Sequence, residues 1–283
     1  GGRRPGDAVA RLRDGGLGAR GLDALVADLC SEERPLHPKI CTLVISAYGR
    51  QRRWRDAIAF LLDVRRKSAE PSLITYTALI SACEKGGEWQ QALGLLADIE
   101  RSSFELDTAT YNAVISACKR AEQWQHAGAL LAAMQRARAE PNAITFCASI
   151  SACAQAGEWR QALGLLADMR HAGLVPDTIT YGAAVSACER GEIWPQALAL
   201  LREMQSWEVR PNLLTLSSAI SSCEKGREWQ RALQLLAQLR LGALLPDVIA
   251  VAAAISACEK GAEWQQALGL LAELLGGGLR TNS

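Results

Sequence analysis

The stretch Leu73–Asp107, which reads LITYTALISACEKGGEWQQALGLLADIERSSFELD, decides the fold of this chain. Its string Ile80–Cys83 ends in a cysteine that returns, within a closely similar string, every 35 residues. The cysteines of this series are Cys83, Cys118, Cys153, Cys188, Cys223 and Cys258. A tryptophan series keeps the same interval, with Trp54, Trp89, Trp124, Trp159, Trp194, Trp229 and Trp264. A fixed period of this length predicts a solenoid, in which each unit buries its apolar face against its neighbours.

Seven regular repeats of 35 residues follow one another without a gap. They are residues 38–72, 73–107, 108–142, 143–177, 178–212, 213–247 and 248–282. Residues 1–37 are less regular, although Leu22–Cys30 resembles the second half of a repeat such as Leu163–Met169. We therefore expect residues 1–37 to form a degenerate N-terminal repeat that caps the first regular one.

Each repeat carries the pattern of two amphipathic helices. Tyr76, Leu79, Ile80 and Cys83 are spaced i, i+3, i+4 and i+7, which is one apolar helical stripe. After a break that contains glycine, the same spacing starts again at Trp89. The sequence thus predicts an all-α fold, an α-solenoid of stacked helix-turn-helix repeats, with the tryptophans packed between helices.

Composition narrows the classes of function. The chain has 31 basic and 30 acidic residues, so it is not a polycation, although one face can still carry a basic stripe. Equivalent cysteines in adjacent repeats should lie about 9–10 Å apart, beyond the reach of a disulfide, so we expect buried, reduced thiols. Cysteine and histidine do not occur at zinc-ligand spacing, and no apolar run is long enough to span a membrane. We expect no metal site and no membrane contact.

Sequence motifs for catalysis and cofactor binding are not convincing. Residues Gly16–Gly21 match the GxGxxG pattern, but no strand precedes them, as a dinucleotide site requires. The sequence has no G-x-S-x-G, HExxH or P-loop motif. We therefore expect neither an enzyme nor a cofactor.

The repeat consensus resembles a known family. It combines Thr-Tyr-(Asn/Thr)-Ala before Ile-Ser-Ala-Cys, then Ala-Leu-x-Leu-Leu, then Pro-Asp or Pro-Asn. This 35-residue helix pair resembles the P-type pentatricopeptide repeat family over residues 38–282. The resemblance implies a right-handed superhelix that binds single-stranded RNA, one base per repeat read by two or three side chains. It also implies a place in the mitochondrion or chloroplast, in RNA processing, stability or translation.

In that family, three positions of each repeat face the RNA, and the resemblance carries them to this chain. The second residues, which would sandwich the bases, are Lys39, Ile74, Ala109, Ile144, Ile179, Leu214 and Ile249. The fifth residues, which would read base edges, are Thr42, Thr77, Asn112, Cys147, Gly182, Ser217 and Ala252. The last residues, which would read with them, are Ser72, Asp107, Asn142, Asp177, Asn212, Asp247 and Asn282.

Short hydroxyl and amide side chains suit this task, because they reach a base edge without a flexible stem. Under the family's code, Asp at the last position goes with G or U and Asn with A or C. Asn at the fifth position goes with pyrimidines, and Thr or Ser with purines. The implied tract is N-G-C-(G/U)-(A/C)-G-N, with weak reading where the fifth residue is Cys147, Gly182 or Ala252. Asp or Asn after proline also suits a helix N-cap, so capping alone is the alternative role of the last residue.

A row of cations recurs near the end of each predicted first helix. Its members are Arg50, Lys85, Arg120, Arg190, Lys225 and Lys260. We expect them to contact successive phosphates beside the base-reading row. The alternative is that each cation only stabilises the C-terminal end of its helix. Glutamates such as Glu84 and Glu224 directly precede some of these cations, and we expect them to point away from the row.

The leading hypothesis is a monomeric, non-enzymatic protein whose partner is single-stranded RNA, with other RNA-processing proteins as further candidate partners. A scaffold that holds a peptide in the same groove is the alternative. A piece of a larger RNA-processing enzyme is a third interpretation.

Overall fold

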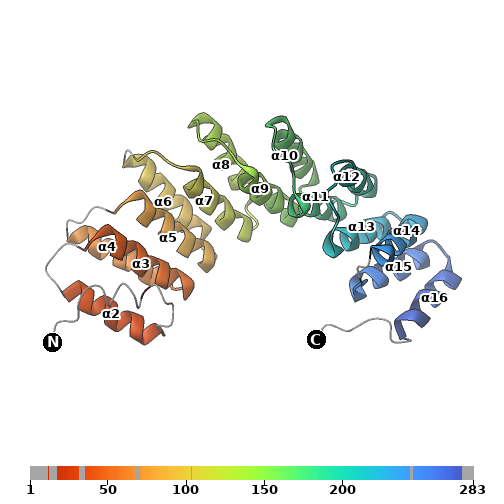
Figure 1. Ribbon diagram of the computed structural model, residues 1–283, viewed down its shortest axis with the longest axis horizontal. Helices are drawn as coiled ribbons and strands as arrows, with labels where there is room; N and C mark the ends of the chain where they lie inside the picture. Colours follow the sequence, from red (N-terminus) through yellow and green to blue (C-terminus); the bar gives the residue numbers. More distant parts are fainter. Residues whose placement is uncertain are drawn as a thin grey trace. The chain divides into compact units, whose positions relative to one another are not determined.

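The computed structural model of the protein describes residues 12, 18–31, 36–67, 71–102, 104–242 and 245–275. Over these residues the regular structure is helical, and they contain no strand (Figure 1). The predicted all-α solenoid of helix pairs is confirmed. The chain divides into two compact units, residues 1–141 and 142–283.

The first compact unit holds one leading helix and three helix pairs. They are α2 (Ala19–Ser31), α3 (Pro38–Arg50), α4 (Trp54–Arg66), α5 (Leu73–Gly86), α6 (Trp89–Arg101), α7 (Thr108–Arg120) and α8 (Trp124–Arg136). The first helices α3, α5 and α7 pack side by side in one layer. Each second helix packs on its own first helix, and α4 and α6 also pack on the first helix that follows.

The second compact unit holds four helix pairs. They are α9 (Ala143–Ala156) with α10 (Trp159–His171), α11 (Thr178–Arg190) with α12 (Trp194–Ser206), α13 (Leu213–Lys225) with α14 (Trp229–Leu241), and α15 (Val248–Lys260) with α16 (Trp264–Leu275). The first helices α9, α11, α13 and α15 again form one closely packed layer. Adjacent second helices lie farther apart, and long side chains bridge some of the gaps between them, as between α10 and α12.

The turn inside each repeat has one geometry. In the second repeat, Gly87 follows α5 in the left-handed conformation with φ +80°, and the Glu88 N–H donates to the Cys83 carbonyl over 3.0 Å. This is the Schellman way of ending a helix, and it satisfies a carbonyl that would lack a partner. The equivalent residue is Gly157 in one other repeat. In the remaining five it is not glycine and has φ between 58° and 60°, as in Arg52, Glu122, Glu192, Arg227 and Ala262.

The tryptophans pack between repeats, as their place on the apolar stripe predicts. A Cβ atom added to Gly191 would lie 2.2 Å from Cδ1 of Trp159, which belongs to the preceding repeat. Trp194 and Trp229 approach the equivalent glycines of the following repeats just as closely. Trp264 begins the last described helix and is 65% exposed. Six of the seven tryptophans are therefore less available for stacking on bases than a free surface ring would be.

The recurring cysteines are buried and reduced, as predicted. All six are at most 2% exposed, and none forms a disulfide. Burial raises the pKa of the Cys83 and Cys223 thiols to about 12. Raised pKa values of this kind make buried thiols unreactive.

Helix α2 contacts the first regular repeat through polar side chains. Asp23 forms an ion pair with Arg53 over 2.9 Å and accepts a hydrogen bond from Tyr48 over 3.4 Å. On its apolar side, Leu22 is fully buried. The GxGxxG match ends inside α2, at Gly21, and Gly16 and Leu17 lie outside the described residues.

Candidate nucleic-acid interface

The second residues of the repeats form a row of exposed side chains at the start of the first helices. The large aliphatic members are between 64% and 71% exposed: Ile74, Ile144, Ile179, Leu214 and Ile249. Lys39 and Ala109, at the same position, are exposed too. Scattered exposed apolar residues need no explanation, but a row at one repeat position marks a surface that binds something apolar or flat.

The last residues of the repeats are the N-caps of the next first helices. Oδ1 of Asp107 accepts from the Thr110 N–H over 2.8 Å, and Oδ1 of Asn212 accepts from the Thr215 N–H over 2.9 Å. The same cap is made by Ser72, Asn142, Asp177 and Asp247. Capping is thus a real role of this position, and it fixes the side chain. With Oδ1 turned to the helix, the second atom of the group is an acceptor in Asp and a donor in Asn.

In the first two regular repeats, the fifth and last residues are linked through a threonine of the next repeat. Thr77 and Thr110 are joined by a hydrogen bond of 2.9 Å between their hydroxyls, and the Thr110 hydroxyl donates to Asp107 over 2.6 Å. In the first repeat, Thr42 lies 3.1 Å from the hydroxyl of Thr75, which is 3.0 Å from that of Ser72. The structure therefore brings together residues that are 30 positions apart in sequence.

Ser217 and Asp247 form the same pair without an intermediary, because Ala250 replaces the threonine. The Ser217 hydroxyl donates to Asp247 over 3.3 Å, and only 3% of Ser217 is exposed. Ser217 is therefore buried and bonded, whereas the predicted reading of a base edge needs an accessible hydroxyl. Thr42, Thr77, Asn112, Cys147 and Gly182 are partly exposed, and Ala252 is exposed.

The threonines that bind the last residues are positioning residues that sequence reasoning missed. Thr75, Thr110, Thr145, Thr180 and Thr215 are at most 1% exposed. Their signal was the threonine that recurs before the tyrosine or its counterpart, two positions ahead of each fifth residue. A buried hydroxyl on an otherwise apolar stripe needs a partner, and here the partner is the last residue of the preceding repeat. Asn282, the last of the predicted base-reading residues, lies outside the described residues.

The predicted phosphate row consists of exposed cations, but several are already bound. Lys225 donates to the Glu189 carbonyl over 3.0 Å, and Arg190 donates to the Gln155 carbonyl, so each holds the end of the preceding first helix. Arg50 donates in the same way to the Leu12 carbonyl over 2.6 Å. Ile74 and Lys85, eleven residues apart in α5, are separated by about 16 Å along the helix axis. The cations thus lie at the far end of the helices from the second residues, so the prediction that they lie beside the base-reading row is wrong.

The prediction that the neighbouring glutamates point away from this row is wrong. Glu224 forms an ion pair with Lys260 over 3.0 Å, and Glu84 lies 3.9 Å from Arg120. In each case the cation comes from the repeat after the glutamate. The error arose because a helical wheel places a glutamate relative to its own helix and says nothing of the helix packed beside it.

Sequence comparison identifies the repeats. The chain matches the PPR repeat family at residues 71–120 and 106–155, the pentatricopeptide repeat domain at residues 39–86, and the PPR repeat at residues 144–174. The chain is a pentatricopeptide repeat protein. No curated protein sequence matches it.

Solved pentatricopeptide repeat structures share the fold. The crystal structure of PPR10 from maize aligns with a TM-score of 0.72 at 25% identity, over 97% of this chain and 39% of PPR10. PPR10 in complex with an 18-nt psaJ RNA element aligns with a TM-score of 0.54 at 16% identity, over 93% of this chain and 44% of that one. The PPR domain of Arabidopsis thaliana protein-only RNase P 1, in complex with tRNA, aligns with a TM-score of 0.56 at 20% identity. The alignment covers 66% of this chain and 95% of that domain. This pentatricopeptide repeat protein spans about two-fifths of the PPR10 chain that it matches.

Other classes of site are not found in the described part of this pentatricopeptide repeat protein. Its described residues contain no group of three or more His, Cys, Asp or Glu side chains that could hold a metal ion. None of its described helices has the length and apolar character needed to cross a bilayer.

Proposed function

We propose that this pentatricopeptide repeat protein binds single-stranded RNA along the N-terminal ends of its first helices, one nucleotide per repeat. The observation that carries the proposal is the row of exposed aliphatic second residues beside the capped last residues. The complexes of PPR10 with an RNA element and of the RNase P 1 domain with tRNA support the same class of ligand.

The row has the dimensions of a set of base slots. Packed helices lie about 8–10 Å apart, so within each compact unit consecutive second residues face each other over a similar distance. A base between two aliphatic side chains needs a contact of about 3.5–4.0 Å on each side. Aliphatic walls accept any base, so discrimination would fall to the polar groups at the base edge.

Those polar groups are the linked fifth and last residues. In the repeat 73–107, Thr77 presents a hydroxyl and Asp107 presents its second carboxylate oxygen beside it. The family's code assigns this pair to G. In the repeat 213–247, the same assignment requires Ser217 to exchange its bond with Asp247 for a bond to the base.

The cation row lies about 16 Å along the helix axis from the second residues, so it would bind phosphates only where the RNA backbone extends along the first helices. There it would contribute affinity without sequence preference. Each of the six cations that binds a phosphate lowers the log–log salt slope by about 0.7 on single strands, so a full row gives about −4. A phosphate would first have to displace the carbonyl or glutamate that Arg190, Lys225 or Lys260 now binds. A slope near zero would contradict this part of the proposal.

The decisive experiment is selection of RNA from a random pool by the wild-type chain and by Asp107→Asn. Asn caps the equivalent helix at Asn212, so the fold should not change. Preference should move from G to A at one nucleotide and stay the same elsewhere. The matched control is Asp98→Asn, the same chemical change on α6 of the same repeat, which should leave every preference unchanged. If the pool yields no preferred sequence, or if Asp107→Asn changes several nucleotides at once, the proposal fails.

We further propose, from family membership, that the protein acts in the mitochondrion or chloroplast, in RNA processing, stability or translation. Bound RNA would be kept from nucleases and from pairing with itself. Fractionation of tagged protein in the source cells tests the compartment.

A further inference from the structure

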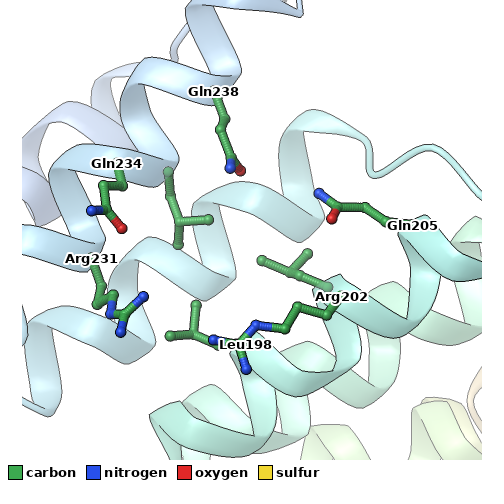
Figure 2. A pocket seen from close by; sticks show the side chains of 8 residues that line it. Leu198, Arg202, Gln205, Arg231, Gln234 and Gln238 are labelled. Carbon is green, nitrogen blue, oxygen red and sulfur yellow. The ribbon is translucent and has the colours of Figure 1, made fainter.

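A groove lies between the second helices α12 and α14, within the second compact unit (Figure 2). Its volume is about 190 Å³. Leu198, Leu201 and Leu235 form its floor and are between 5% and 9% exposed. Exposed polar side chains form its rim: Arg202, Gln205, Arg231, Gln234 and Gln238.

The grooves on either side are closed by ion pairs. Between α10 and α12, Arg170 is bonded to Glu203, and between α14 and α16, Arg240 is bonded to Glu273 over 2.7 Å. Gln205 and Gln238 occupy the equivalent positions in the middle groove, 35 residues from those partners. This groove therefore lacks the charged bridge that its two neighbours have.

The middle groove instead carries two extra positive charges. Arg202 stands where the adjacent repeats have Ala167 and Ala237, and Arg231 stands where they have glutamine. Among the described residues, neither guanidinium has a carboxylate within the 4.0 Å of an ion pair. The eight described residues that line the groove include no acidic one. Two uncompensated guanidinium groups above a leucine floor make a site that selects an anion with an apolar neighbour.

We propose that this groove binds an acidic segment of a partner protein. Each arginine offers a planar fork of N–H donors that fits a carboxylate in a bidentate way. The glutamine amides both donate and accept, which suits the N–H and C=O groups of a peptide backbone. The leucine floor takes an apolar side chain between the acidic residues. The inference does not depend on RNA binding, since the groove belongs to the second helices and the base-reading row to the first.

A peptide is a better fit than an RNA strand. Each of the three rim glutamines has a carbonyl acceptor, which a peptide N–H can fill, whereas the backbone of an RNA strand has no donors apart from its 2′-hydroxyls. No aromatic side chain is among the eight lining residues, so bases would have nothing on which to stack. The contact area is small, so we expect weak, salt-sensitive binding of the kind used in transient assemblies.

The test is selection of a displayed library of random dodecapeptides on the full chain, with the R202Q/R231Q variant as the counter-selection target. We expect enrichment of peptides in which Asp or Glu flanks a large apolar residue, and at least 10-fold weaker binding of a synthetic copy to R202Q/R231Q. Both arginines are exposed, so the variant should keep its fold. The matched control is R240Q, which removes one positive charge from a groove that already holds a glutamate, and should leave the binding unchanged.

Two further variants separate a built site from general charge attraction. R202E/R231E should reverse the preference, so that selected peptides carry Lys or Arg. Q205R/Q238E copies the ion pair of the neighbouring grooves and should block the peptide although both original arginines remain. The proposal is overturned if no acidic peptide is enriched, if R202Q/R231Q binds the selected peptides as well as wild type does, or if R202Q/R231Q instead loses RNA affinity, which would make the groove an RNA contact.

Discussion

Two glycines of one repeat should respond in opposite directions to the same substitution. Gly87 ends the turn after α5 with φ +80°, whereas Gly94 lies in the interior of α6 with ordinary helical geometry. A Cβ atom added at either residue meets no atom within 4 Å. Replacement of each glycine by alanine therefore changes the backbone preference and leaves packing untouched.

The expected free energies follow from the two conformations. Alanine in place of glycine within an exposed helix stabilises by about 1 kcal/mol, so Gly94→Ala should raise the free energy of unfolding by that amount. At Gly87, the left-handed conformation costs an L-residue about 1–2 kcal/mol, and the stiffer unfolded chain offsets about 0.4–1 kcal/mol of this. Gly87→Ala should therefore lower the free energy of unfolding by about 1 kcal/mol.

Urea unfolding followed by circular dichroism measures the difference. A gap of about 2 kcal/mol between the variants, with a slope of about 1–3 kcal/mol per molar urea, separates their midpoints by about 1 M. Arg227→Gly provides the reciprocal test, because Arg227 holds φ +60° without being glycine, and its midpoint should rise. If Gly87→Ala and Gly94→Ala shift the midpoint in the same direction, the reasoning from the turn is refuted.

Three other predictions concern single side chains. Ile179→Asp should weaken RNA binding at least about 10-fold in a filter assay, because the new charge repels phosphate. The free energy of unfolding should change by no more than about 0.5 kcal/mol, because the residue is 64% exposed. Unchanged RNA affinity would show that Ile179 is not part of the interface. Ser222→Ala should raise the free energy of unfolding by about 1–2 kcal/mol, because the buried Ser222 hydroxyl has no hydrogen-bond partner among the described residues. The next repeat has Ala257 at this position, so alanine fits there. A lower urea midpoint of the variant would contradict this prediction. Burial raises the thiol pKa of Cys83 to about 12 and that of Cys118 to about 11, from an ordinary 9.0. The stability from these neutral thiols is therefore full below pH 9 and is lost as pH rises from 9 through about 11 for Cys118 and about 12 for Cys83. The urea midpoint should be lower at about pH 10 than at about pH 8, and the difference should be smaller in Cys118→Ala.

Much of the fold could be predicted because it depends on short-range periodicity. The burial of Cys83 follows from its place on the apolar stripe of one helix. The N-cap made by Asp107 follows from the position of this Asp directly before a predicted helix. The strict interval of 35 residues extends both results to the other repeats that have these residues at the same positions. No knowledge of long-range contacts was needed for either.

Features that join two repeats were harder to foresee. The burial of Ser217 depends on Asp247 and on the absence of a threonine at Ala250, which no pattern within one helix reveals. The bond from Glu224 to Lys260 depends on how two neighbouring helices are aligned along their axes.

The groove between α12 and α14 was visible in the sequence only as a departure from the repeat pattern. Arg202 stands where the neighbouring repeats have alanine, but a single exposed arginine does not predict a binding site. Its meaning comes from Arg231, which belongs to another repeat and lines the same groove.

The last residue of each repeat caps a helix and is also proposed to read a base, and the first role limits the second. Under the proposed function, the side chain that contacts a base at this position must also cap the following helix, as Asn212 and Asp247 do. Only a handful of short polar residues can, and a misfit forfeits about 1 kcal/mol of helix stability. Helix capping therefore restricts which residues can occupy the last position. New base specificities would have to come from the fifth residue, which caps no helix.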